Sequence, residues 1–289
     1  MHYKEYKTIL LPGGRMNIYR GCTHGCIYCD SRSACYQMDH AFEDIEVKLA
    51  APEQLERELK RKRKRCMIGT GSMSDPYMHC EQQLQYTRKC LEAIDRCGFG
   101  ATLITKSALV LRDLDLLKSI NSKSKCVVQM TLTTFDEELC KIIEPNVSTT
   151  RERFETLCTL RDNGIPTVVW LSPFLPYIND TRENLAGLLD CCFRAKVHAV
   201  IFFGVGLTLR EGNREYFYAQ LDKYFPGMKQ RYIREFGNSY EIMSPHNREL
   251  TAMLRAECKA HGVLCDTNEV FGYLQEFQDK TDLAQLKLF

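Results

Sequence analysis

The chain has 289 residues, 44% of them hydrophobic, which is enough to build a sizeable buried core. Its 39 basic and 37 acidic side chains nearly balance, so it lacks the electropositive excess of a protein that grips many phosphates. A membrane span needs about 18 uninterrupted apolar residues, and no stretch of the sequence approaches this length. No secretion signal opens the chain. Duplex DNA is therefore a poor first partner, and we expect a cytoplasmic protein that neither spans a membrane nor is secreted.

Fifteen cysteines are many for such a chain, and the odd number argues against a complete disulfide framework. Most of them lie inside apolar-patterned segments, among them Cys90, Cys126, Cys158 and Cys191. A reduced cysteine in such a place behaves as a small hydrophobic residue. We therefore interpret most of the thiols as core side chains.

Strand-like and helix-like segments alternate from residue 16 to residue 203. The predicted strands cover residues 16–19, 66–69, 101–105, 125–132, 167–171 and 199–203. The predicted helices cover residues 52–64, 84–96, 111–120, 149–163 and 182–194. Alternation of this kind is typical of a parallel sheet covered by helices.

Six strand–helix units are too few for a closed eight-stranded barrel. The sequence therefore predicts an α/β fold, a partial (β/α)6 barrel of the TIM type with a C-terminal helical extension. We assign residues 1–205 to the barrel core and residues 206–289 to an extension that completes the substrate pocket. The active site is expected at the C-terminal ends of the strands, where the loops converge.

Cys22, Cys26 and Cys29 follow the first predicted strand at a glycine-containing turn, with the spacing C-x3-C-x2-C. Three thiolates suit a 4Fe-4S cluster whose fourth iron stays open for another ligand. A structural zinc site would need a fourth protein ligand. Three residues could supply that ligand: Cys35, His24 and His40.

With Tyr28 before its last cysteine, this loop resembles the signature of the radical S-adenosylmethionine superfamily. In that superfamily the open iron chelates the methionine moiety, and one electron cleaves the sulfonium to give a 5'-deoxyadenosyl radical. The resemblance implies a 4Fe-4S cluster on Cys22, Cys26 and Cys29, with S-adenosylmethionine as the second cofactor. It also implies an external one-electron donor such as flavodoxin or ferredoxin.

Further segments are similar to the spore-photoproduct-lyase-like branch of the superfamily, in the order of that branch. They are residues 17–22, 71–77, 105–107, 143–146, 153–154 and 173–180. Two departures stand out: Tyr177 replaces an expected glycine, and Asp75-Pro76-Tyr77 is followed by Met78-His79-Cys80. Both lie in loops after predicted strands, where they are expected to alter the substrate pocket.

The resemblance implies a set of side chains that contact S-adenosylmethionine: Tyr28, Ser72, Ser74, Asp75, Lys106, Thr133 and Arg153. Asp75 is suited to an ammonium group, and Lys106 or Arg153 to a carboxylate. Ordinary alternatives stay open, because an aspartate before proline often only caps a turn. Arg153 could likewise form an ion pair on a helix surface.

Substrate-binding candidates lie mostly in the last third of the chain. Tyr240 could stack on a planar base, Glu241 could accept hydrogen bonds from its amide edge, and His79 could transfer a proton. We predict His79 and Glu241 as catalytic residues and His79, Asn238, Tyr240 and Glu241 as substrate-binding residues. The plainer alternatives are a core tyrosine, a surface glutamate and a turn histidine.

Three functions remain open. The first is a radical lyase for a small, modified nucleobase, most specifically queuine, which would release 7-aminomethyl-7-deazaguanine for salvage of the queuosine precursor. The second is repair of a thymine lesion in DNA, which needs a basic groove and a hydrogen donor such as Cys80 or Cys140. The third is a non-enzymatic electron carrier, which would usually fill all four iron positions with protein ligands. The balanced charge favours the small molecule and makes a nucleic-acid partner the weaker expectation.

Overall fold

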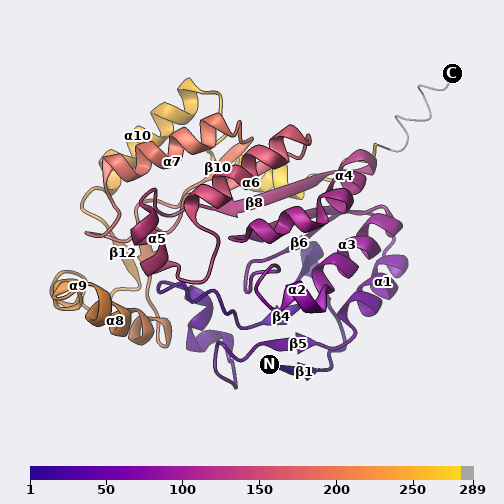
Figure 1. Ribbon diagram of the computed structural model, residues 1–289, viewed down its shortest axis with the longest axis horizontal. Coiled ribbons are helices and arrows are strands. Elements are labelled where there is room, and N and C mark those ends of the chain that lie inside the picture. The colour runs from indigo at the N-terminus through magenta and orange to yellow at the C-terminus, as the bar shows by residue number, and fades with distance from the viewer. Residues whose placement is uncertain (281–289) are drawn as a thin grey trace.

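The computed structural model describes residues 1–280, and the end of the predicted extension, residues 281–289, lies outside the described residues. A seven-stranded sheet with the order β10-β9-β8-β7-β6-β3-β2 forms the centre of the molecule. Helices cover its outer face (Figure 1). No helix among the described residues is long and apolar enough to cross a bilayer.

Six strands of this sheet run parallel, and β2 (Leu10–Leu11) pairs antiparallel with the first of them. They are β3 (Arg15–Met16), β6 (Met67–Thr70), β7 (Gly100–Thr105), β8 (Cys126–Thr131), β9 (Thr167–Trp170) and β10 (Ala199–Ile201). The main helices between them are α1 (Ala51–Arg61), α3 (Tyr86–Cys97), α4 (Leu114–Lys123), α6 (Thr150–Asp162) and α7 (Arg182–Arg194). The predicted α/β partial barrel is confirmed.

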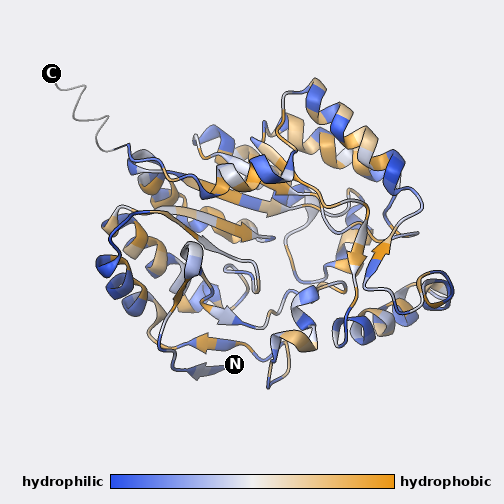
Figure 2. Cartoon of the chain, turned by 180° about the vertical axis from the view of Figure 1, so that it is seen from behind, coloured by the Kyte–Doolittle hydropathy of each residue, from blue (hydrophilic) through white to orange (hydrophobic). Residues whose placement is uncertain are grey.

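Side chains of β8 alternate between the two faces of the sheet, as the period of a strand requires. Cys126 and Val128 pack under the covering helices, whereas Val127 faces the concave side. There it meets Val270 of α11 (Thr267–Gln275), a helix that fills the concave face near the start of the strands. The covering helices carry both apolar and polar segments, as amphipathic helices do (Figure 2).

A second, three-stranded sheet lies beside the N-terminus. In it β5 (Glu46–Lys48) pairs parallel with β1 (His2–Lys4) and antiparallel with β4 (Tyr19–Arg20). The predicted strand 16–19 is therefore split, because the chain leaves the main sheet after Met16. The Ile18 carbonyl already accepts a hydrogen bond from the Lys48 amide at 3.1 Å.

Two short helices, α2 (Glu81–Leu84) and α5 (Glu137–Ile143), interrupt loops after strands. Short 3-10 turns cover Pro12–Gly14, Asp30–Arg32, Ala34–Tyr36 and Ala108–Asp113. Neither the two short helices nor the 3-10 turns were predicted, because segments of one or two turns carry too little periodicity to separate them from loops.

Beyond β10 the described residues form a strand pair and four helices. Strands β11 (Gly206–Thr208) and β12 (Glu241–Met243) pair antiparallel. Helices α8 (Asn213–Tyr224) and α9 (Met228–Phe236) lie between them in sequence, and α10 (Asn247–Ala260) follows and contacts α7. Phe217, Tyr232 and Ile242 of this region share a buried cluster with Ile27 of the cysteine loop. The helical extension thus packs against the loop that carries the three cysteines.

Candidate active site

A cavity of about 650 Å³ opens at the C-terminal edge of the main sheet. Strand ends supply Ile104, Thr131 and Trp170, and the cysteine loop supplies Tyr28 and Cys29. The strand pair β11–β12 and its neighbours supply the other side. This is the edge at which barrel enzymes of this architecture place their active sites.

Backbone hydrogen bonds hold the cysteine loop in place. The Cys22 amide donates to the Phe42 carbonyl at 3.0 Å, and the Ile27 amide donates to the Ile143 carbonyl at 3.0 Å. The loop turns at Gly21, whose φ of 82° is left-handed and whose Cβ would lie only 2.4 Å from the Phe42 carbonyl oxygen. Cys22 and Cys26 are buried, and Cys29 is half-buried at the wall of the cavity.

The spacing of the three sulfurs suits a cluster better than a single ion. Among residues 1–280, no set of potential ligand atoms within 4.8 Å of one another contains the three cysteines. Two sulfurs on one zinc ion, each about 2.3 Å from it, can be at most roughly 4.6 Å apart. A cubane provides a separate iron for each thiolate and so accepts the wider spacing.

The three residues considered as a fourth zinc ligand are engaged elsewhere. His24 is buried with its Nδ1 atom 3.5 Å from an Asp75 oxygen, and Cys35 accepts a hydrogen bond from Arg210 at 3.4 Å. His40 lies near Glu46 in the N-terminal sheet. Within the described part of the chain, none of them completes a compact site with the cysteines. The donor set therefore fits the cluster and not structural zinc.

Lys106 places a positive charge beside the thiols. Burial by itself would lower the pKa of Lys106, but Cys26 and Glu144 outweigh this effect and the pKa is raised. Burial raises the pKa of Cys22 to about 12 and holds that of Cys26 well above its usual value. A nearby cation favours the thiolate form that binds iron. Lys106 also lines the cavity, as expected of a residue that contacts the cofactor.

Tyr28 and Arg153 meet at a buried carboxylate. The Tyr28 hydroxyl donates to Glu144, and Arg153 Nη2 lies 2.5 Å from the second oxygen of that carboxylate. Arg153 Nη1 donates to the Thr131 carbonyl at 2.7 Å. Arg153 is completely buried, so it neither lies on a helix surface nor faces the cavity, whereas Tyr28 does line it.

Asp75 organises the loop after β6. Its carboxylate accepts hydrogen bonds from the Thr105 hydroxyl at 2.7 Å and from the amides of Tyr77 and Lys106 at 2.8 Å each. Asp75 is buried and does not line the cavity. These contacts match the alternative in which Asp75 caps a turn.

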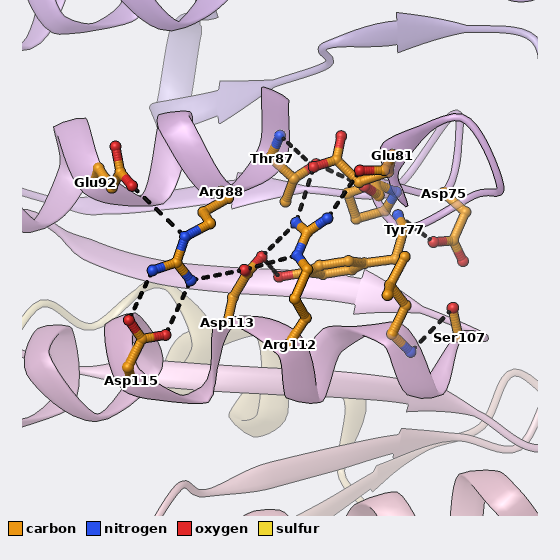
Figure 3. Close-up of polar contacts among 12 residues, drawn as sticks. Asp75, Tyr77, Glu81, Thr87, Arg88, Glu92, Ser107, Arg112, Asp113 and Asp115 are labelled. Atoms are coloured by element: carbon orange, nitrogen blue, oxygen red, sulfur yellow. Dashed lines mark hydrogen bonds and ion pairs between the residues drawn. The ribbon is translucent and has the colours of Figure 1, made fainter. Parts of the chain in front are cut away.

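An ionic network around the buried carboxylates of Glu81 and Asp113 contacts this loop through Tyr77 (Figure 3). The Tyr77 hydroxyl donates to Asp113 at 3.1 Å, and Arg112 bridges Asp113 to Glu81 with contacts of 2.7 and 2.9 Å. Arg88 extends the network to Asp113 at 3.1 Å. The network fixes the position of the loop that precedes the cavity wall.

Of the remaining residues predicted to contact the cofactor, one lines the cavity and two do not. Ser72 lines the cavity, but Ser74 is buried and donates to the Tyr19 carbonyl at 2.8 Å. Thr133 is buried away from the cavity, and its hydroxyl lacks a hydrogen-bond partner among the described residues. Thr131, two residues earlier, lines the cavity instead.

The structure separates the four predicted substrate residues into two pairs. Tyr240 and Glu241 line the cavity, and Arg210 donates to the Tyr240 hydroxyl at 2.5 Å. The 45% exposure of Tyr240 excludes a core role. Asn238 and His79 are exposed and do not line the cavity; the His79 ring contacts the Thr23 hydroxyl at 3.3 Å.

Several cavity residues were not predicted: Asp30, Ser31, Ile104, Thr131, Trp170, Ser172, Pro173 and Phe203. Trp170 ends β9, and its ring centre lies 5.8 Å from that of Phe203. Its indole N–H donates to Gln129 at 2.8 Å, which fixes the ring. Its place as the single tryptophan, at the end of a predicted strand, was the signal that could have identified it.

Tyr177, which replaces the expected glycine, adopts a left-handed φ of 65°. Its ring stacks on Phe236 of α9 at 6.2 Å, and its hydroxyl donates to Glu235. The position thus keeps the backbone conformation that favours glycine, and the tyrosine side chain connects this loop to the C-terminal helices.

Comparison with known proteins identifies the family to which the chain is similar. The profile of the radical SAM superfamily matches residues 16–189 of the chain. An uncharacterized protein of Mycobacterium tuberculosis (strain ATCC 25618 / H37Rv) is 29% identical over 241 residues, which cover 81% of this chain and 70% of the relative. One from Methanocaldococcus jannaschii is 34% identical over 183 residues, which cover 62% and 68%.

Solved structures show the same fold at low sequence identity. Spore photoproduct lyase complexed with dinucleoside spore photoproduct aligns with a TM-score of 0.64 and 13% identity, over 91% of this chain and 80% of that one. The radical S-adenosylmethionine methyltransferase TsrM from Kitasatospora setae, with cobalamin and a [4Fe-4S] cluster bound, aligns with a TM-score of 0.56 and 14% identity. That alignment covers 84% of this chain and 52% of TsrM.

Proposed function

Because the chain belongs to the radical SAM superfamily, whose cofactors are a 4Fe-4S cluster and S-adenosylmethionine, we propose that it is a lyase for a small, planar, nucleobase-type substrate. The specific substrate that we propose is queuine, cleaved to 7-aminomethyl-7-deazaguanine, so that the enzyme is a queuine lyase. Membership in this superfamily of enzymes argues against a simple electron carrier.

Cys22, Cys26 and Cys29 are the residues that we assign to the cluster, since their loop is anchored and their sulfurs are widely spaced. When bound, the reduced cluster and S-adenosylmethionine would supply a 5'-deoxyadenosyl radical for removing a hydrogen atom from the cyclopentenediol of queuine. The weakened carbon–nitrogen bond to the aminomethyl group would then break, and one electron from the external donor with one proton would convert the released nitrogen to the amine. We assign Tyr28, Ser72 and Lys106 to contacts with the cofactor, and their position in the lining of the same cavity as Cys29 supports this.

Five predicted residues receive revised roles. Asp75 and Ser74 position the loop after β6, and Arg153 supports Tyr28 through Glu144. His79 and Asn238 lie outside the cavity, so Glu241 is the catalytic candidate that we retain.

The observation that carries the proposal is that aromatic side chains and a carboxylate line one cavity beside Cys29. Trp170, Phe203 and Tyr240 offer flat surfaces to a planar ring, and Glu241 offers an acceptor for its amide edge. The volume of about 650 Å³ falls within the roughly 300–1,000 Å³ of small-molecule sites.

Repair of a thymine lesion is the second candidate, favoured by the shared fold with spore photoproduct lyase. Two observations count against it. The formal net charge is only +2, and neither Cys80 nor Cys140, the proposed hydrogen donors, lines the cavity. We therefore rank it below the small-molecule lyase.

The proposal includes a cytoplasmic setting with an external one-electron donor of the flavodoxin or ferredoxin type. All 15 cysteines are free thiols, as is usual in a reducing compartment.

The deciding experiment uses anaerobically reconstituted enzyme with dithionite and S-adenosylmethionine, with and without queuine, followed by mass spectrometry. Queuine should stimulate 5'-deoxyadenosine formation and yield 7-aminomethyl-7-deazaguanine. If 5'-deoxyadenosine forms while queuine stays intact, the substrate assignment is wrong, and dinucleoside thymine lesions are the next compounds to assay.

A further inference from the structure

A second cavity, of about 260 Å³, is lined by the N-terminal sheet and by both flanks of the cysteine loop. The sheet supplies Arg20 of β4 and Lys48 of β5, and the flanks of the loop supply Gly21 and Ser31. Ser31 is the one residue that this cavity shares with the candidate active site. The volume lies just below the roughly 300–1,000 Å³ of sites for drug-sized ligands, so the cavity suits a smaller molecule.

One face of the N-terminal sheet carries more positive than negative charge. Glu46 and Lys48 lie on the same face of β5, because side chains two residues apart in a strand share a face. Arg20 of β4 is the register partner of Glu46, and Lys4 of β1 is the register partner of Lys48 (Figure 1). Of these four side chains, three are cations and only Glu46 is an anion.

Lys4 forms the ion pair with that carboxylate. The Lys4 ammonium lies 3.3 Å from Glu46 Oε2 and 3.6 Å from an Asp39 oxygen. The other Glu46 oxygen, Oε1, accepts a hydrogen bond from the Tyr6 hydroxyl. Neither Glu46 nor Asp39 lines the cavity. The negative charge therefore lies beside Lys4 and not at the cavity.

Lys48 and Arg20 reach the cavity without a carboxylate partner. Lys48 is only 7% exposed, and its Nζ atom lies 4.6 Å from the centre of the Tyr6 ring. Within residues 1–280 its side chain forms neither an ion pair nor a hydrogen bond, although a lysine buried to this degree is usually paired. Arg20 donates to the carbonyl oxygens of Tyr36 and Gln37, at 3.0 and 3.2 Å, which do not neutralise its charge.

The electrostatics of Lys48 agree with a missing counter-charge. Burial lowers the pKa of Lys48, and Glu46 raises it by less, so the pKa stays below its ordinary value. Arg20 lowers the pKa further, because it is a second positive charge nearby. An anion in the cavity would act in the opposite direction and stabilise the ammonium.

Asn17 adds an unsatisfied amide group to the same cavity. Its Oδ1 atom is buried and lacks a hydrogen-bond partner in the described part of the chain. A half-turn of the amide would present its NH2 group instead, which is a donor. Ser31 contributes a hydroxyl that can also donate. Two cations and two neutral donors at one cavity match a ligand whose oxygens accept hydrogen bonds and carry negative charge.

We propose that this cavity binds a small oxyanion, of the phosphate or short-carboxylate type, through Lys48, Arg20 and Asn17. The anion would supply the counter-charge that Lys48 lacks. Arg20 and Gly21 lead directly into Cys22, so an occupied cavity would also hold the entry to the cysteine loop. The proposal does not depend on which substrate the enzyme cleaves.

Isothermal titration calorimetry of the full, cluster-loaded chain tests this site under anaerobic conditions, with inorganic phosphate and with malonate at constant ionic strength. Wild type should bind about one anion per chain, and Lys48→Met should weaken this binding at least tenfold. Lys89→Met is the matched control and should bind like wild type. Lys89 is exposed on α3, and its ammonium lies 5.4 Å from the centre of the Tyr86 ring, so it makes the same kind of contact outside the cavity.

The two probes distinguish the sources of the oxyanion. Binding of phosphate alone would identify a phosphate-type ligand, and binding of malonate alone a carboxylate-type ligand. The proposal is overturned if neither anion binds saturably. It is also overturned if Lys48→Met binds like wild type, which would assign the binding to another surface, such as the exposed cations of residues 60–65.

Thermal unfolding of the same samples separates loss of the site from loss of the fold. Without an anion, Lys48→Met should be at least as stable as wild type, because it removes a buried charge that has no partner. The bound anion should raise the melting temperature of wild type but not that of Lys48→Met. If Lys48→Met is unfolded, Asn17→Leu replaces it, since it removes the amide at similar size, and should weaken anion binding at least threefold.

Discussion

The Tyr28 hydroxyl donates a hydrogen bond to Glu144, and so connects the cysteine loop to a carboxylate 116 residues further along the chain. Arg153 pairs with the same carboxylate, and all three side chains are buried. Neither Glu144 nor Arg153 lines the cavity. They act on the site through Tyr28, whose position they fix.

Replacing Glu144 with alanine should strongly destabilise the fold, because the completely buried Arg153 would lose its partner. Breaking a buried pair on one side costs about 3–5 kcal/mol. Urea unfolding followed by circular dichroism would measure the loss. Glu138→Ala removes an exposed pair with Lys141 and is the control that should change little. Equal stability of Glu144→Ala and wild type would mean that the pair is not formed.

Cys26→Ala should abolish cluster assembly, because the remaining two cysteines leave one more iron without a protein ligand. Anaerobically purified wild type should contain about four irons per chain, and the variant almost none. Cys66→Ala, a half-buried cysteine outside the loop, should keep its iron and sulfide. Wild-type iron content in Cys26→Ala would refute the ligand assignment.

Glu241→Gln should impair substrate turnover while leaving uncoupled cleavage of S-adenosylmethionine intact. Glu241 lines the cavity, and losing a charged hydrogen bond costs about 1.5–3 kcal/mol, or roughly 10- to 150-fold in kcat/KM. Glu249→Gln, on α10 outside the cavity, is the matched control. The two products, 5'-deoxyadenosine and the cleaved base, should be quantified together. Unchanged turnover of the base would remove Glu241 from the site.

Stability should fall slightly between about pH 7 and pH 5 because of His198, whose ring stacks on Tyr273 of α11 at 3.9 Å. Burial, and secondarily Lys125, lower the pKa of His198 in the folded protein. A lowered folded pKa means that the stabilisation is complete above the unfolded pKa of about 6.5 and is lost as the pH falls through the folded value.

His198→Phe keeps the stacking without the titration, so its unfolding midpoint in urea should depend less on pH across this range. His246→Phe, at the start of α10, is the comparison variant and should follow wild type. A slope that persists unchanged in His198→Phe would assign the pH dependence to another group.

The main sheet could be predicted because its strands are continuous apolar runs and its helices are amphipathic. The predicted helix 182–194 coincides with α7 (Arg182–Arg194). The N-terminal sheet could not be predicted, because β1 and β4 are short and pair with β5, whose Glu46 and Lys48 are charged yet buried. Local sequence does not reveal such long-range pairing.

The candidate site was predicted where chemistry depends on spacing and missed where it depends on tertiary contacts. The three cysteines and Lys106 could be proposed from the sequence because they follow strand ends in recognisable motifs, and the structure places Cys29 and Lys106 at one cavity. The pairing of Arg153 with Glu144 could not be predicted, because the fold brings the two residues together and both are fully buried. His79 lies in the same loop as Asp75, yet it contacts the Thr23 hydroxyl and does not line the cavity.

The backbone hydrogen bonds from the Ile27 amide to the Ile143 carbonyl and from the Asn146 amide to the His24 carbonyl also set an order of events during synthesis. The ribosome delivers the three thiols first, and their anchor follows more than a hundred residues later. At about 5–20 residues per second, this is a delay of roughly 6–25 s. During that interval the loop lacks the segment that holds it, so we expect cluster insertion at these cysteines to follow translation of β8 and α5.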